Sequence, residues 1–253
     1  MFERFLICCI LVLICSQCAS PKKKQNLEER DWRFFYRTAL EWQRKGRCDK
    51  AIEEFKKAVK LEPKQGEVWN YLGLAQFSCK LYPEAVESYH KALEITPFYT
   101  DVHNNLGILY GEMGKSQDAL MEFNEALRDK KYPAGNVYYN VGMLYLRMED
   151  YGSALEALES ACLLKPEMFA WRHHLGLVFE KSGDDKAALE AFEKVLETQP
   201  DYAPSLFQAA LLYMKANNKS RAKDYFTRVI GSSPGSDLAQ EAKQHLREIG
   251  AGK

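Results

Sequence analysis

The five histidines are the side chains of this chain that could most readily bind a metal ion or transfer protons near neutral pH. They are His90, His103, His173, His174 and His245. None stands in an HExxH pattern or at the spacing from cysteine that a zinc site requires. Adjacent histidines on a helix point to different sides, so we expect one of His173 and His174 to line a surface and the other to pack between elements. The histidines therefore predict no metal site.

A second candidate for chemistry is the segment GEMGKS, Gly111 to Ser116, which looks like half of a phosphate-binding loop. The complete loop needs a glycine five residues before Gly114, where this chain has Leu109. Gly114 also suits an ordinary turn between two helices. Paired carboxylates occur along the chain at the density of a solvated helix face. We therefore predict no nucleotide, no cofactor, no small-molecule substrate and no catalytic activity.

Four of the seven cysteines lie in the N-terminal segment MFERFLICCILVLICSQCAS. Its apolar run from Phe5 to Cys15 has eleven residues, too few for a membrane-spanning helix, which needs about 20, but typical of a secretory signal. Cys18 stands where a bacterial lipoprotein carries its acylated cysteine, although Gln17 replaces the usual small residue. We predict a lipoprotein-type signal peptide over residues 1–17, lipid attachment at Cys18 and a polar tether over residues 18–31. The alternative is a soluble periplasmic protein.

The remaining cysteines are Cys48, Cys79 and Cys162. Three thiols cannot all pair, and their wide spacing is not that of a disulfide framework. We therefore expect them to be small buried side chains.

The composition is that of a folded protein without an excess of charge. Lys and Arg number 35, and Asp and Glu also number 35, so the basic surface that nucleic-acid binding requires is not indicated. The hydrophobic fraction of 46% and the charged fraction of 28% are ordinary for a soluble globular chain. A length of 253 residues allows compact domains or one elongated array.

A repeat of 34 residues decides between these architectures. A small residue of a first helix recurs as Ala39, Gly73, Gly107, Gly142, Gly176 and Ala210. A small residue of a second helix recurs as Ala51, Ala85, Ala119, Ala154, Ala188 and Ala222. A large apolar residue follows four positions later as Phe55, Tyr89, Phe123, Leu158, Phe192 and Phe226. Six units therefore cover residues 32–65, 66–99, 100–134, 135–168, 169–202 and 203–234.

Within each unit the apolar positions step by three and four, as in a helix with one buried stripe. Turn signals divide the unit into two helices. One such hairpin cannot bury its own apolar face, so neighbouring hairpins must stack. Residues 235–253 predict one more helix and a tail, with Ser236 or Asp237 as N-cap, Gly250 as the stop and a polar outer face.

These residues closely resemble the tetratricopeptide repeat. The resemblance implies an all-α, right-handed superhelix of six helical hairpins plus a capping helix, with the first helix of each hairpin lining a concave groove. The exposed groove positions that it implies are Tyr36, Leu40, Asn70, Leu74, Phe77, Asn104, Ile108, Tyr139, Met143, Leu146, His173 and Phe207. Each apolar member could instead pack between helices.

The groove chemistry points to a protein or peptide partner. Tyr36 and Leu40 stand where the family's carboxylate clamp would need Lys and Asn. An apolar helix or extended peptide therefore fits better, with Asn70, Asn104 and Asn140 available to its backbone.

The junction RDKKYPAGN breaks the period, because Lys131 replaces the usual proline and the interval between units becomes 35 residues. The extra residue belongs in a loop, so we predict a local kink at Tyr132 and Pro133 between two three-repeat halves. Six repeats, this length, the predicted lipid and the Tyr-Pro junction together resemble the pilotins of type IV pilus secretins. That resemblance implies a lipid-anchored protein on the periplasmic face of the outer membrane whose partner is a secretin subunit.

Two other functions remain open. The chain could be a general envelope adaptor that docks peptidases or cell-wall hydrolases together, or a cytosolic scaffold whose N-terminus is a false signal. Fold alone does not decide among them.

Overall fold

The computed structural model describes residues 31–129 and 134–251. The predicted signal peptide, the lipid site at Cys18, nearly all of the tether, and the junction residues Tyr132 and Pro133 lie outside the described residues.

The described residues form thirteen α-helices and no strand. The first helices of the hairpins are α2 (Trp32–Arg44), α4 (Gly66–Ser78), α6 (Thr100–Glu112), α8 (Gly135–Arg147), α10 (Phe169–Ser182) and α12 (Ala203–Lys215). Their partners are α3 (Cys48–Leu61), α5 (Tyr82–Ile95), α7 (Ser116–Leu127), α9 (Tyr151–Leu164), α11 (Asp185–Thr198) and α13 (Lys219–Ser232), and α14 (Asp237–Ala251) ends the array. None of the described helices is long and apolar enough to cross a membrane.

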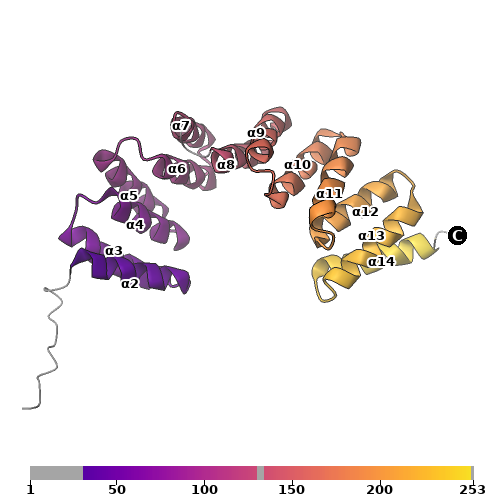
Figure 1. The fold of residues 1–253 in the computed structure, drawn as a ribbon, viewed down its shortest axis with the longest axis horizontal. Coiled ribbons are helices and arrows are strands. Elements are labelled where there is room, and N and C mark those ends of the chain that lie inside the picture. The colour runs from indigo at the N-terminus through magenta and orange to yellow at the C-terminus, as the bar shows by residue number, and fades with distance from the viewer. Residues whose placement is uncertain (1–30, 130–133, 252–253) are drawn as a thin grey trace, which may run out of the picture.

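The hairpins stack in chain order and build an open arch, with α2 near one end and α14 near the other (Figure 1). The two helices of each hairpin pack most closely, and each hairpin then contacts the next. The predicted fold class, an all-α superhelix of six hairpins plus a capping helix, is confirmed.

The core of each hairpin is the contact between a small residue and a large ring or leucine. A methyl group added at Gly107 would lie 2.5 Å from Cε1 of Phe123, and one at Gly73 would lie 2.6 Å from Cε1 of Tyr89. Phe123 and Tyr89 are buried. The small residues therefore set how closely the paired helices approach.

Each hairpin turn contains one residue in the left-handed conformation. It is glycine in three turns, with φ of +69° at Gly46, +73° at Gly114 and +90° at Gly183. The other three turns use Lys80, Glu149 and Asn217, with φ of 61°, 60° and 57°. The phosphate-loop resemblance at Gly114 is thus a turn of the kind that every hairpin contains.

The helix α14 covers the end of the array by packing on α13 and α12. The hydroxyl of Ser236 accepts a hydrogen bond from the backbone N–H of Ala239 at 3.2 Å, so Ser236 is the N-cap. The ring of His245 stacks on Phe226 with centroids 5.1 Å apart. The expected stop at Gly250 is wrong, because the helix continues to Ala251.

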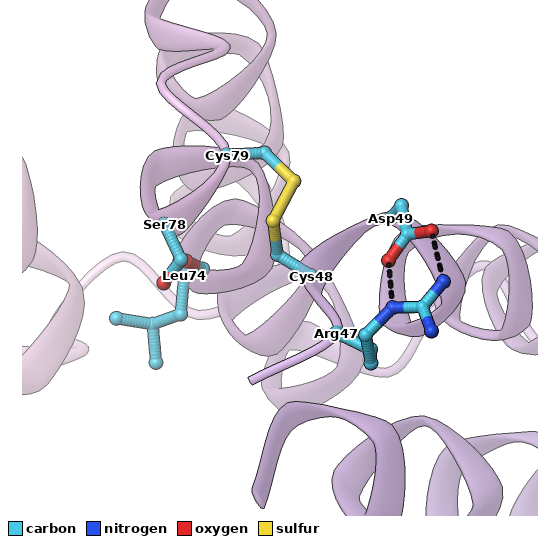
Figure 2. The surroundings of a disulfide bond; sticks show 6 residues. All are labelled: Arg47, Cys48, Asp49, Leu74, Ser78 and Cys79. Carbon is cyan, nitrogen blue, oxygen red and sulfur yellow. Dashed lines mark hydrogen bonds and ion pairs between the residues drawn. A yellow bond between two sulfur atoms is a disulfide. The ribbon is translucent and has the colours of Figure 1, made fainter. Parts of the chain in front are cut away.

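The expectation for two cysteines is also wrong. Cys48 at the start of α3 and Cys79 just after α4 form a disulfide, with Cα atoms 5.7 Å apart (Figure 2). Because α3 and α4 run in opposite directions and pack together, the beginning of one lies beside the end of the other. The sequence separation of 31 residues does not indicate the bond, because the two cysteines meet only when neighbouring hairpins stack. Cys162 is free and buried, as expected.

The interval before α8 is one residue longer than the others, since α6 begins at Thr100 and α8 at Gly135. The helices α7 and α8 share the fewest contacts of any consecutive pair. The coupling between the two three-hairpin halves is therefore weaker than that within each hairpin.

Candidate partner-binding groove

The first helices of the hairpins carry the predicted groove positions. Nine of these side chains are partly exposed: Tyr36, Leu40, Leu74, Phe77, Asn104, Ile108, Tyr139, Met143 and Leu146. Tyr36, Leu40, Leu74, Phe77, Ile108, Tyr139 and Leu146 also pack in part on the neighbouring core. Core packing therefore accounts for part of each of these seven side chains, and contact of the exposed part with a partner stays a prediction.

The third and fourth hairpins bring several of these residues together around a hollow of about 220 Å³. It is lined by Ile108, Glu112, Phe123, Tyr139, Asn140, Met143 and Arg147. Two aliphatic side chains and two aromatic rings provide most of the contact surface, and an amide and an ion pair lie beside them. This arrangement could hold an apolar side chain of a bound peptide while leaving hydrogen-bonding groups for its backbone.

An ion pair fixes one side of the hollow. Nη1 of Arg147 lies 2.7 Å from Oε1 of Glu112, and both side chains are about half exposed. Arg147 also fills the space beside Gly111, where an added methyl group would lie 2.6 Å from Nη2. Glu112 and Arg147 occupy equivalent positions in the repeat, because they lie 35 residues apart, the interval between the third and fourth units. Their opposite charges at equivalent positions could have indicated this pair.

Side-chain hydrogen bonds link each first helix to the next. Nδ2 of Asn140 donates to Oδ1 of Asn104 at 2.9 Å, and Nδ2 of Asn105 donates to Oδ1 of Asn70 at 3.0 Å. The remaining links are Tyr36 to Glu67 at 2.8 Å, Tyr139 to His174 at 3.2 Å, and His173 to Ser205 at 3.0 Å. Sequence reasoning missed these links, because their partners sit at non-equivalent positions in neighbouring units.

The predicted groove asparagines already make hydrogen bonds within the protein, which limits the groups that they can offer to a partner. Asn70 is 5% exposed and its carbonyl oxygen is occupied, so it is not a groove residue. In the Asn104 and Asn140 pair, one amide oxygen and one amide nitrogen are used by the mutual bond. Each amide also has a second polar atom, so this pair retains one donor and one acceptor group that could meet a peptide backbone.

His173 and Phe207 also belong to the interior rather than to the groove surface. His173 is 7% exposed and contacts Phe192, Tyr202 and Ser205. Burial, with the neighbouring His174, lowers the pKa of His173 to about 4, so its ring is neutral at pH 7. Phe207 packs edge-on against Phe226 with centroids 5.6 Å apart. His173 is covered by Tyr202 and Ser205 at the start of the next hairpin, and Phe207 by Phe226 of its own hairpin and His245 of α14.

The pKa of His103 is shifted in the opposite direction to that of His173. Its Nδ1 lies 2.7 Å from Oε2 of Glu122, and its Nε2 lies 3.2 Å from the carbonyl oxygen of Pro97. The hydrogen bond to Glu122 raises the pKa of His103 despite partial burial. This contact joins α6 to α7 and accounts for the histidine as a structural residue.

Family models identify the repeat. A model described as a TPR repeat matches residues 77–114, and models described as a tetratricopeptide repeat match residues 43–65, 104–162, 139–203 and 205–236. Together they span most of the six hairpins. Among curated proteins, none shows significant sequence similarity to the chain.

Solved structures share the fold over most of the chain. PilF of Pseudomonas aeruginosa is 21% identical, with a TM-score of 0.71 over 85% of this chain and 97% of its own. PilW, described as a widely conserved type IV pilus biogenesis factor, is 22% identical, with a TM-score of 0.74 over 83% and 97% of the two chains. YrrB, described as a TPR protein with an unusual peptide-binding site, is 24% identical, with a TM-score of 0.60 over 76% and 99%.

The architecture is that of a scaffold for protein or peptide partners, and its fold resembles those of pilus biogenesis factors. Six stacked helical hairpins, small residues facing large ones at fixed positions and the matching family models lead to one conclusion. The chain belongs to the tetratricopeptide repeat proteins.

Proposed function

We propose that the chain is a non-catalytic, lipid-anchored adaptor of the bacterial envelope, a pilotin that helps a type IV pilus secretin to reach the outer membrane or to assemble there. The observation that carries this proposal is the match in size and hairpin arrangement to PilF and PilW, of which 97% is covered in each case. A generic repeat array could have any number of units, so agreement over the whole length is more specific than the repeat itself.

Two independent features support export. The sequence begins with an apolar run followed by Cys18, as in a lipoprotein signal. The Cys48–Cys79 disulfide lies outside that segment, and disulfides form and persist mainly in oxidising compartments such as the periplasm. Both features favour a location on the periplasmic side of the envelope.

The hollow between the third and fourth hairpins is the proposed anchor site for the partner. A secretin segment with apolar side chains would place one of them against Ile108, Tyr139 and Met143. The Asn104 and Asn140 pair would then bind its backbone. Burial of a single large apolar side chain contributes roughly 1.5 to 3 kcal/mol, enough to dominate a peptide interaction.

Deletion of the gene tests the proposal. We expect loss of secretin multimers and of twitching while the secretin monomer is still made. Complementation with Met143→Glu should fail, since it places a charge in the hollow. Met121→Glu on α7 is the matched control, because Met121 is 61% exposed and outside the hollow. Normal secretin multimers in the deletion strain would contradict the proposal.

The lipid anchor has its own test. Replacing Cys18 by Ser should move the protein from the membrane fraction to the soluble periplasmic fraction. If the variant stays with membranes as the unmodified protein does, the chain is not held there by acylation of Cys18.

The alternative is a general envelope adaptor, which the apolar groove would also suit. In that case affinity purification from envelopes should recover peptidases or cell-wall hydrolases, and deletion should leave pili intact. Recovery of a secretin subunit without these enzymes would exclude the alternative.

A further inference from the structure

The overall neutrality of the chain conceals a strong separation of charge along the array. The first hairpin, residues 32–65, holds ten Lys and Arg against five Asp and Glu. The four middle hairpins, residues 66–202, hold twelve against twenty-two. The sixth, residues 203–234, holds five against one. The two ends of the arch are therefore basic and its centre is acidic (Figure 1).

The outer side of α3 carries three of the ten basic residues of the first hairpin. Ala51, Ile52, Phe55, Ala58 and Val59 bury the opposite side of this helix. Its solvent side exposes Lys56, Lys57 and Lys60 beside the exposed carboxylate of Glu53, and Lys64 follows three residues after the end of the helix. Positions four residues apart share a helix face, so Lys56 and Lys60 point the same way.

Most of these lysines have no acidic partner among the described residues. Lys57 pairs with Glu54 at 2.6 Å, but no ion pair engages Lys56, Lys60 or Lys64 within residues 31–129 and 134–251. Leu61, in the same patch, is 48% exposed. Free ammonium groups beside an exposed apolar side chain are what an anionic lipid surface attracts.

The second helices of the middle hairpins carry acidic residues at several of the equivalent positions. The position of Lys60 is Glu94 in the second hairpin and Glu197 in the fifth. The position of Lys56 is Glu159 in the fourth hairpin and Glu193 in the fifth. The helix α13 of the sixth hairpin is also basic, with Lys219, Arg221, Lys223 and Arg228 against Asp224, but only the first hairpin lies next to the predicted anchor.

We propose that the outer face of α3, made by Lys56, Lys60, Lys64 and Leu61, binds the anionic headgroups of a phospholipid membrane. This assignment rests on the proposed anchor, because a lipid at Cys18 is thirteen residues before Asp31 and holds the first hairpin within at most about 45 Å of the bilayer. Lys22, Lys23 and Lys24 lie between the two. The contact would orient the arch and leave its acidic centre and groove away from the equally anionic membrane, which repels them.

The outer face of α3 is tested in a protein without the lipid anchor, so that the result does not depend on whether the secretin proposal holds. Residues 18–253 carrying Cys18→Ser are mixed with vesicles of phosphatidylethanolamine and phosphatidylglycerol, or of phosphatidylcholine alone, and sedimented. We expect binding to the first vesicles only, and a marked loss of that binding when salt is raised to roughly 1 M, where charges are screened beyond about 3 Å.

Charge reversal then locates the surface. The variant Lys56→Glu, Lys60→Glu, Lys64→Glu should bind the anionic vesicles at least about tenfold more weakly, since each lysine near such a surface contributes roughly a fivefold factor. The matched control Lys186→Glu, Lys194→Glu, Lys223→Glu changes the net charge equally at exposed positions elsewhere and should retain most of the binding. Circular dichroism must show that both variants are folded.

Three results would overturn the proposal. The first is that the protein binds neutral vesicles as well as anionic ones. The second is that the two triple variants lose vesicle binding to the same extent. The third is that the α3 variant binds vesicles as before but changes its self-association in sedimentation velocity. The last would assign the lysine face to the acidic centre of a second copy.

Discussion

At the scale of single residues, the stability of this protein depends on small side chains that stand against large ones. Gly73, Gly107 and Gly176 each leave room for an aromatic ring of the second helix, while Ala39 and Ala210 take the same position in the first and last hairpins. An alanine therefore fits at this position only in hairpins whose two helices lie far enough apart to leave room for its methyl group. Each glycine of this group is therefore a packing residue and not a flexible one.

Gly107→Ala should destabilise the protein by about 1 to 3 kcal/mol, because the new methyl group would lie 2.5 Å from the ring of Phe123 and would force the helices apart. Gly231→Ala is the matched control. Gly231 lies in α13 with no atom near its added methyl group, so that variant should be more stable by about 0.5 to 1 kcal/mol. Urea unfolding measures both, and a stabilised Gly107→Ala would contradict the packing argument.

His173 should make stability depend on pH. The pKa of His173 is lowered to about 4 in the fold by burial and by His174, from an ordinary value of 6.5, so the folded state favours the neutral ring. Its contribution is fully present above about pH 6.5 and is lost as the pH falls towards 4. The loss reaches about 2 kcal/mol near pH 4.5.

The comparison with His173→Gln isolates this effect. The free energy of unfolding, measured in urea at several pH values, should fall more steeply for the unmodified protein than for the variant between about pH 6.5 and 4.5. Groups that do not contact His173 titrate equally in both proteins, so their effects cancel in the difference, whereas the coupling between His173 and the adjacent His174 belongs to the measured effect. Parallel pH profiles would show that His173 is not held neutral.

At the scale of the elements, the disulfide adds a covalent link between two hairpins that otherwise meet through side-chain packing and the Tyr36–Glu67 hydrogen bond. Cys48 is the first residue of α3 and Cys79 follows α4, and Figure 2 shows the bond bridging these helix ends. The first hairpin has no preceding hairpin within the described residues to cover its outer side. The bond therefore ties the terminal hairpin to the array.

The double variant Cys48→Ser, Cys79→Ser should be less stable by about 3 kcal/mol, because the bond restricts the unfolded chain over a separation of 31 residues. Thermal unfolding with and without dithiothreitol checks this. The reductant should lower the melting temperature of the unmodified protein and leave that of the double variant unchanged. An equal response of the two would mean that the cysteines are not bonded.

At the scale of the whole molecule, a helix covers the C-terminal end of the array, and the two central hairpins make few contacts with each other. The helix α14 covers the sixth hairpin, with Ala239 and Ala242 fully buried, whereas α7 and α8 share few contacts. Repeat arrays are stabilised by contacts between neighbours. We therefore expect the ends and the centre to respond differently when contacts are removed.

Truncation after Pro234 should expose the apolar side of α12 and α13 that α14 covers. The expected result is a lower melting temperature and association into larger species in size-exclusion chromatography, since a repeat array needs a polar terminal face for solubility. Truncation after Ile249 is the control, because it keeps Leu238, Ala242, Leu246 and Ile249, which pack against the last hairpin. A monomeric, equally stable protein ending at Pro234 would contradict a capping role.

The helices, their pairing and the small-to-large contacts follow from the sequence alone, because each is set within about 34 residues and is repeated six times. The repeat pattern also predicted Ile108, Tyr139 and Met143 in the groove, three residues that line one hollow. The disulfide, the burial of Asn70, His173 and Phe207, and the Asn104 to Asn140 link could be seen only in the folded chain. They depend on how far one hairpin or helix is rotated and shifted against the next, because a residue that is exposed in a single hairpin becomes buried when the following element stacks upon it.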